Sequence, residues 1–316
     1  MKTSAVFLAK SLMKSIIRQT EKEVTIKAPW GNIKALTWGN PSNPPVLLCH
    51  GRLDACTSFR PLAALLPDTF FYVTVDLPGN GRSDHLPKGA RYTILDFVPT
   101  IQKIKDYFKW NNFAYIGHSL GVIISKYYDI AYPGDILRSV ELDPMPAYFT
   151  FSPDELSNWY KFSYELFYSE ERYPKLNGSL ETAPKYTYEQ ILELTMKSRG
   201  LSREPAEQIL ERSLVPAGDG LYWLVYDQRM KVLAMLPHSP EQLQKIYTSL
   251  TTPTFCILAT ETLKTGHYDK VPFVKDVTLW PNKNYRVKIV DGGHDVHVER
   301  PECIAKDISE FLLEKI

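Results

Sequence analysis

The chain has 316 residues, 44% of them hydrophobic and 23% charged, so it can bury the core of one large globular domain that carries an insertion. Its 37 lysines and arginines balance 36 aspartates and glutamates, which excludes the basic surface that recruits nucleic acid. It has no run of about 18 uncharged apolar residues, so we expect no integral membrane segment.

The first 22 residues form a segment of their own. Every charged residue before Glu21 is basic, serines and threonines lie between them, and the apolar residues can share one helical face. This pattern resembles a mitochondrial transit peptide. An amphipathic leader helix that stays on the protein is an equally good interpretation. We therefore predict an intracellular protein, either mitochondrial or cytoplasmic.

From residue 23 onward, strand-like and helix-like segments alternate, which is typical of a parallel sheet with crossover helices. The first two strands differ, because their polarity alternates around a turn and predicts an antiparallel hairpin at the sheet edge. The eight expected strands are residues 23–27, 33–38, 46–49, 71–75, 113–116, 137–142, 254–258 and 285–290. Helices are expected at residues 58–66, 93–110, from 122 onward, and 301–316. The predicted fold is α/β, with a mostly parallel eight-stranded sheet flanked by helices.

Residues 146–248 interrupt this alternation after the sixth strand. They are rich in aromatic residues, have a helical pattern and contain no apolar strand run. So long an excursion inside a compact domain is expected to have structure of its own, often over an active site. We interpret the segment as a helical cap, and residues 23–145 and 249–316 as the core.

The pentapeptide Gly117-His118-Ser119-Leu120-Gly121 lies where the fifth predicted strand passes into a helix. A serine at such a sharp turn has a strained backbone and an exposed hydroxyl, and the flanking glycines let strand and helix approach closely. The pattern predicts that Ser119 is a nucleophile.

A serine hydroxyl needs a general base within hydrogen-bond reach. His294, in the run Asp291-Gly292-Gly293-His294-Asp295, directly follows the last predicted strand, so it is expected at the same edge of the sheet as the nucleophile. We predict that it is the base. His297 is the alternative.

An oxyanion also needs hydrogen-bond donors. The backbone N–H of Leu120 is one candidate. The backbone N–H of Arg52 is the other, because it follows His50 and Gly51 directly after the third predicted strand, and Gly51 lets the backbone approach closely.

The carboxylate that orients the histidine is harder to choose. Residues 259–263, after the seventh strand, hold threonine where many hydrolases have aspartate. Asp143, at the end of the sixth strand, is our first choice. Asp269 is the next alternative, followed by Glu261 and Asp291.

Several of these motifs together resemble the serine hydrolase-like proteins of animals, which include the kraken-type hydrolases of the α/β-hydrolase superfamily. The similar stretches are residues 28–31, 45–54, 76–83 and 109–119, and the resemblance is weak across the predicted cap. It implies that Ser119 is the nucleophile and His294 the base. The substrate is not implied.

The predicted function is that of a serine hydrolase, a carboxylesterase that acts on a small or medium apolar ester. We expect a small-molecule substrate and neither a metal nor another cofactor. One alternative is a cofactor-free dioxygenase, an enzyme class on this fold that keeps serine and histidine and uses an acid after the sixth strand. The other is a ligand-binding relative without catalysis, suggested by the missing acid after the seventh strand. The four cysteines have no C-x-x-C pair or zinc-like spacing, which favours a reducing compartment.

Overall fold

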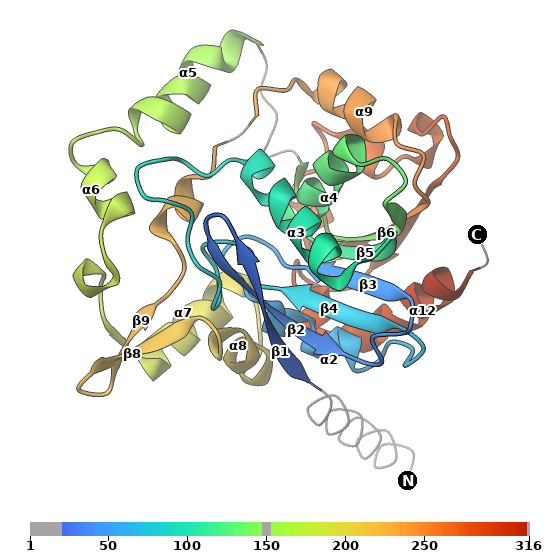
Figure 1. Cartoon of the computed structure of the whole chain (residues 1–316). Helices are drawn as coiled ribbons and strands as arrows, with labels where there is room; N and C mark the ends of the chain where they lie inside the picture. Colours follow the sequence, from blue (N-terminus) through green and yellow to red (C-terminus); the bar gives the residue numbers. More distant parts are fainter. Residues whose placement is uncertain (1–20, 147–152, 235, 315–316) are drawn as a thin grey trace.

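The central element of the protein is an eight-stranded sheet with helices on both faces (Figure 1). A computed structural model of the chain describes residues 21–146, 153–234 and 236–314. The predicted leader, residues 1–22, therefore lies almost wholly outside the described residues. The strands run β1 (Lys22–Ala28), β2 (Gly31–Trp38), β3 (Pro45–Cys49), β4 (Phe71–Val75), β5 (Phe113–His118), β6 (Ile136–Leu142), β10 (Thr254–Ala259) and β11 (Tyr285–Val290).

The strand order is β1-β2-β4-β3-β5-β6-β10-β11. β1 pairs antiparallel with β2, and β2 pairs antiparallel with β4. The strands from β4 to β11 are parallel. The predicted hairpin and the predicted parallel sheet are thus both present, and the carboxyl ends of the parallel strands meet at one edge.

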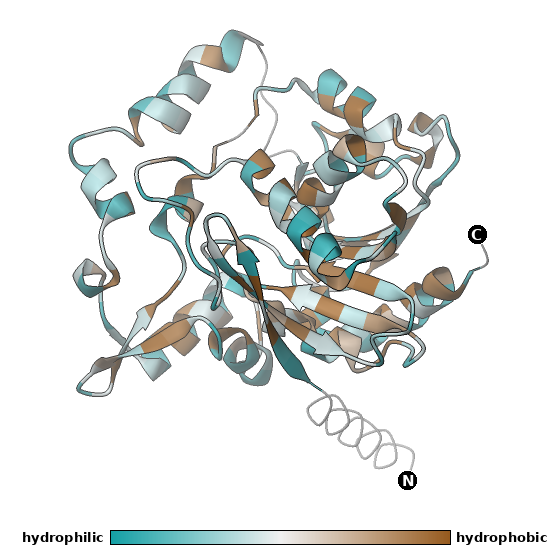
Figure 2. Ribbon diagram, in the orientation of Figure 1, coloured by the Kyte–Doolittle hydropathy of each residue, from teal (hydrophilic) through white to brown (hydrophobic). Residues whose placement is uncertain are grey.

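The two faces of the sheet bury two separate apolar cores, because successive side chains of a strand point to opposite sides. In β3, Val46 and Leu48 belong to one core, and Leu47 and Cys49 to the other. Figure 2 shows the corresponding hydrophobic bands along the central strands. Helices α2 (Arg60–Ala63) and α12 (Ala305–Leu313) cover the first face, and α3 (Val98–Phe108) and α4 (Leu120–Ala131) cover the second.

The insertion between β6 and β10 is mostly helical, as expected. Its helices are α5 (Leu156–Tyr160), α6 (Arg172–Asn177), α7 (Tyr188–Arg199), α8 (Arg203–Leu210) and α9 (Pro240–Thr248). In Figure 1, α5 and α6 lie at the periphery, away from the central sheet, and Figure 2 shows them as mainly hydrophilic.

The insertion also contains a small antiparallel sheet that the sequence pattern does not predict. Its strands are β7 (Tyr186–Thr187), β8 (Leu214–Gly218) and β9 (Leu221–Leu224), in the order β7-β9-β8. They are too short, and too little buried, to produce a recognisable apolar run. Within the described residues, no helix is long and apolar enough to span a membrane.

Candidate active site

Ser119 lies in the turn that joins β5 to α4, with a strained backbone at φ 52° and ψ −110°. Its amide donates to the carbonyl oxygen of Leu142 at 3.0 Å, which ties the turn to the end of β6. A Cβ atom at Gly121 would collide with the carbonyl oxygen of Cys49, and one at Gly117 would lie 2.8 Å from the amide nitrogen of Val122. Only glycine therefore allows the close approach of β3, β5 and α4 on which this turn depends.

His294 lies in the loop after β11, and its partner is Asp143. Its Nδ1 atom is 2.6 Å from Oδ2 of Asp143. Because a carboxylate only accepts hydrogen bonds, Nδ1 is the donor, and in the neutral imidazole Nε2 then has the free lone pair. The histidine side chain is 30% exposed, whereas the aspartate is fully buried. His294 is thus held from the protein interior and is partly exposed.

Asp143 accepts four hydrogen bonds. Besides His294, Thr262 Oγ1 donates to Oδ2 at 2.5 Å. The Tyr268 hydroxyl and the Ala259 amide donate to Oδ1 at 3.0 and 2.9 Å. Hydrogen bonds to the charged form offset the cost of burying a carboxylate. A left-handed backbone at Asp143, φ 44°, turns the chain at the end of β6.

The three alternative acids have other surroundings. Asp269 is 73% exposed and pairs with Lys275 at 3.1 Å. Asp291 is 81% exposed and pairs with Arg300 at 2.8 Å. Glu261 is exposed at the start of α10 (Thr260–Lys264). Of the four candidate carboxylates, Asp143 is the one hydrogen-bonded to His294.

The two amides predicted to bind an oxyanion flank the serine turn. Leu120 is the first residue of α4, so its N–H has no intrahelical acceptor. A Cβ at Gly51 would lie 3.2 Å from the Ser119 Cβ, which places the loop after β3 directly beside the serine. The Arg52 side chain points elsewhere and donates from Nη1 to the carbonyl oxygen of Lys231 at 3.3 Å.

His50 supports this loop from within. The ring is fully buried. Its Nε2 accepts from the Leu77 amide at 3.1 Å, so the proton is on Nδ1, which lies 2.6 Å from the carbonyl oxygen of Gly51. The histidine thereby ties the loop after β3 to the end of β4.

A buried polar cluster lies behind the candidate catalytic groups. It consists of Asp54, His118, Asp295 and His297, whose potential ligand atoms lie within 4.8 Å of one another. Two carboxylates and two imidazoles could hold a metal ion. However, the guanidinium of Arg199 contacts both carboxylates and supplies the positive charge at this place.

Both histidines of the cluster are kept neutral. Burial, reinforced by neighbouring positive charge, holds the pKa of His118 well below its usual value, and burial lowers that of His297 to about 4. His118 Nε2 lies 3.0 Å from the carbonyl oxygen of His294. His297, the alternative base, is fully buried behind it.

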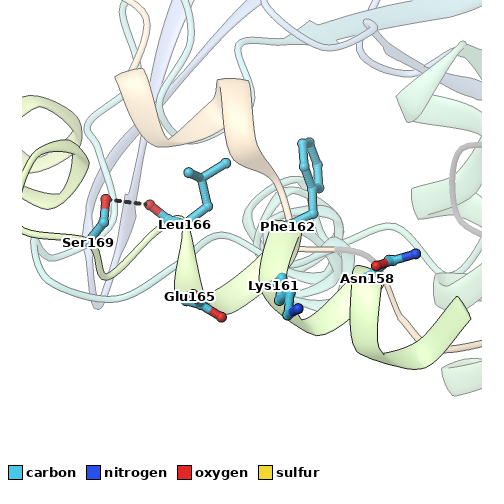
Figure 3. A pocket seen from close by; sticks show the side chains of 6 residues that line it. All are labelled: Asn158, Lys161, Phe162, Glu165, Leu166 and Ser169. Atoms are coloured by element: carbon cyan, nitrogen blue, oxygen red, sulfur yellow. Dashed lines mark hydrogen bonds between the residues drawn. The ribbon is translucent and has the colours of Figure 1, made fainter.

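A separate groove of about 390 Å³ lies on the insertion (Figure 3). One helical segment supplies its lining, and Figure 3 shows the side chains of Phe162 and Leu166 pointing to the opposite side from Glu165. The lining residues are Asn158, Lys161, Phe162, Glu165, Leu166 and Ser169. None of them is a candidate catalytic residue.

Comparison with known proteins places the chain in a family. A family model described as the alpha/beta hydrolase fold matches residues 44–301. The chain belongs to the α/β-hydrolase fold family. The human serine hydrolase-like protein 2 is 29% identical, with 92% of this chain and 93% of that protein covered. A serine hydrolase-like protein of Danio rerio is 27% identical, over 94% of this chain and 90% of that protein. These similarities confirm the resemblance to the serine hydrolase-like proteins.

A solved structure supports the same fold. A hypothetical protein of Pseudomonas aeruginosa has a TM-score of 0.78 and 25% identity, covering 93% of this α/β hydrolase and 100% of that chain. In the present chain, Ser119, Asp143 and His294 follow the carboxyl ends of β5, β6 and β11.

Sequence reasoning missed the groups that surround the acid and the cluster. Tyr268 and Thr262 hydrogen-bond to Asp143, but neither belongs to a recognisable motif. Thr262 lies in residues 259–263, the segment that has threonine where an aspartate was expected. Arg199 carries no local signal, because its partners are distant in the sequence.

Proposed function

We propose that this α/β hydrolase is a serine hydrolase that cleaves a small or medium apolar ester. Ser119 is the nucleophile, His294 is the general base, and Asp143 is the carboxylate that orients His294. The observation that carries the proposal is the 2.6 Å contact between His294 Nδ1 and Asp143 Oδ2. In the neutral imidazole this contact puts the proton on Nδ1, so that Nε2 has the free lone pair that can accept a proton from a serine hydroxyl.

The reaction proceeds in two halves. Ser119 Oγ attacks the ester carbonyl while His294 Nε2 takes its proton, and the amides of Leu120 and Arg52 stabilise the oxyanion. The imidazolium then protonates the leaving alcohol, which leaves an acyl-serine. In the second half, His294 removes a proton from water, the hydroxide attacks the acyl group, and the acid is released as the serine regains its proton.

We also propose that residues 146–248 form a cap over this site. The contact of Arg52 with Lys231 and the contacts of Arg199 with Asp54 and Asp295 support this role, because they join the insertion to the loops that carry the candidate catalytic groups.

A fluorophosphonate probe tests the activated serine. Wild-type protein should be labelled and Ser119→Ala should not. Ser125→Ala is the matched control, since Ser125 is a buried serine of α4 whose hydroxyl donates to the carbonyl oxygen of Val122. Absence of labelling in the wild type, or labelling that survives in Ser119→Ala, would falsify the proposal.

Asparagine variants test the acid. Asp143→Asn should reduce kcat on an ester substrate by about 10⁴-fold, because the amide no longer selects the Nδ1–H tautomer of His294. Asp269→Asn should leave kcat unchanged, since its carboxylate is exposed and paired with Lys275. Equal kcat values for the two variants would contradict the assignment of Asp143.

One observation supports the alternative hypothesis of a dioxygenase: Asp143, the carboxylate hydrogen-bonded to His294, follows the sixth strand. An oxygen electrode separates the two functions. Substrate turnover without oxygen consumption supports the hydrolase, and oxygen consumption that depends on His294 supports the dioxygenase.

A further inference from the structure

Arg199 joins the insertion to two loops of the core. It is the last residue of α7, which Gly200 ends in a left-handed conformation at φ 65°. Its Nε donates to Oδ2 of Asp295 at 3.0 Å, and its Nη1 and Nη2 donate to the two carboxylate oxygens of Asp54 at 3.1 and 3.2 Å. Nη2 also contacts Oδ1 of Asp295. One guanidinium thus holds two carboxylates, each through two oxygens.

Both carboxylates are immediate neighbours of candidate catalytic groups. Asp295 directly follows His294, and Asp54 lies in the same loop as Arg52. Completing the arrangement, His118 precedes Ser119 and hydrogen-bonds to the carbonyl oxygen of His294. The cluster around Arg199 therefore contacts the chain next to the nucleophile, the base and an oxyanion donor.

The charges require a cation at this place. Asp54 is fully buried and Asp295 is 4% exposed, while the Arg199 side chain is 18% exposed. Burial by itself raises the pKa of Asp54, but the guanidinium brings it down to about 2. His118 and His297 are neutral. Without Arg199, two buried negative charges would face each other and drive the two loops apart.

We propose that Arg199 is a positioning residue for catalysis. It sets the separation between the loop that carries His294 and the loop that carries the Arg52 amide, so that base and oxyanion donor face the same carbonyl group. The inference rests on the proposed function. Because its Nε, Nη1 and Nη2 atoms all bind the two aspartates, Arg199 acts through these loops and does not bind substrate.

The first test compares Arg199→Met with Arg203→Met. Arg203 is the matched control, a second arginine of the insertion whose ion pairs with Glu189 and Glu207 are exposed. The rate of fluorophosphonate labelling should fall about 10- to 100-fold in Arg199→Met, the effect of a small misplacement of reacting groups, and stay unchanged in Arg203→Met. On an ester, kcat should fall while KM stays near its wild-type value. Millimolar guanidinium should restore part of the labelling rate in Arg199→Ala.

A triple variant distinguishes loss of positioning from loss of folding. Arg199→Met combined with Asp54→Asn and Asp295→Asn removes the repulsion between carboxylates, and it should fold yet be labelled as slowly as the single variant. Wild-type labelling rates in the single or the triple variant would overturn the inference while leaving the proposed function intact.

Hydrogen exchange makes the test independent of activity. Amides of residues 50–56 and 291–298 should exchange faster in Arg199→Met than in the wild type, and Arg203→Met should match the wild type. If the wild type resists the probe, the proposed function fails, and exchange still decides the contact. Faster exchange in both segments shows that Arg199 orders the two loops, and together with the slower labelling it supports the positioning role. Unchanged exchange overturns that role.

Discussion

His297 shows how burial controls a single residue. Its ring is fully buried and lies tilted against Phe59 and His118, at ring-centroid distances of 5.1 and 4.2 Å. Neither ring nitrogen has a hydrogen-bond partner among the described residues. Desolvation therefore lowers the pKa of His297 from 6.5 to about 4. The folded protein therefore favours the neutral ring over the charged ring.

This shift predicts a loss of stability in acid. Between pH 4 and 6.5 the unfolded chain binds a proton that the folded protein does not, so the free energy of unfolding should fall by about 3 kcal/mol as the pH drops from 7 to 4. Urea unfolding at several pH values measures it. His297→Gln should show a shallower dependence, to which His118, His238 and His267 still contribute because burial lowers their pKa values as well. Identical pH dependence in the two proteins would contradict the assignment. The stabilising effect of Asp54 is lost only as the pH falls from 3.8 through about 2, outside this window.

At the scale of elements, the turn between β5 and α4 holds a residue with a strained backbone. Ser119 has φ 52° and ψ −110°, a conformation that is unfavourable for any residue with a Cβ atom. Close contacts at Gly117 and Gly121 leave the chain no other path. The strain is therefore built into the junction of these two elements.

Ser119→Gly should relieve this strain. We expect the free energy of unfolding to rise by about 1 kcal/mol, since a strained residue costs about 1–3 kcal/mol and the flexible unfolded glycine offsets part of the gain. Urea unfolding gives the value, with Ser119→Ala as the control that removes the hydroxyl and keeps the Cβ atom. A glycine variant no more stable than the alanine variant would refute the prediction. Neither variant should react with the fluorophosphonate probe.

For the whole molecule, buried arginines connect the insertion to the core. Arg212 is 2% exposed, and its Nε and Nη1 atoms donate to Asp76 at 2.8 Å and to Glu23 at 2.6 Å. Arg199 makes the corresponding contacts with Asp54 and Asp295. Two arginines of the insertion therefore neutralise three buried carboxylates of the core, those of Asp54, Asp76 and Asp295.

Arg212→Met should destabilise the protein by about 3–5 kcal/mol, because it leaves the fully buried carboxylate of Asp76 without its cation. Urea unfolding is again the measurement. Arg203→Met, which removes only exposed ion pairs, should not change the unfolding midpoint measurably. Similar midpoints for the two variants would show that the buried pair contributes little to holding the insertion on the core.

Most of the fold could be predicted from the sequence, because its signals are local. Apolar runs bounded by turn residues predicted the eight strands of the main sheet, and the polarity of residues 23–38 predicted the antiparallel edge. The small sheet of the insertion could not be predicted from the sequence, because strands of two to five residues with half-buried side chains leave no periodic pattern.

The sequence by itself determined the family, the serine turn and the histidine after the last strand, since each depends on neighbouring residues in one short segment. Only the tertiary structure decided which carboxylate meets His294 and which cation lies behind it. Asp143, Asp269, Glu261 and Asp291 all come after β6, β10 or β11 in the chain, and their sequence positions do not distinguish them. Hydrogen bonds from Ala259, Thr262 and Tyr268, and the reach of Arg199 from the insertion, exist only once distant segments are packed together.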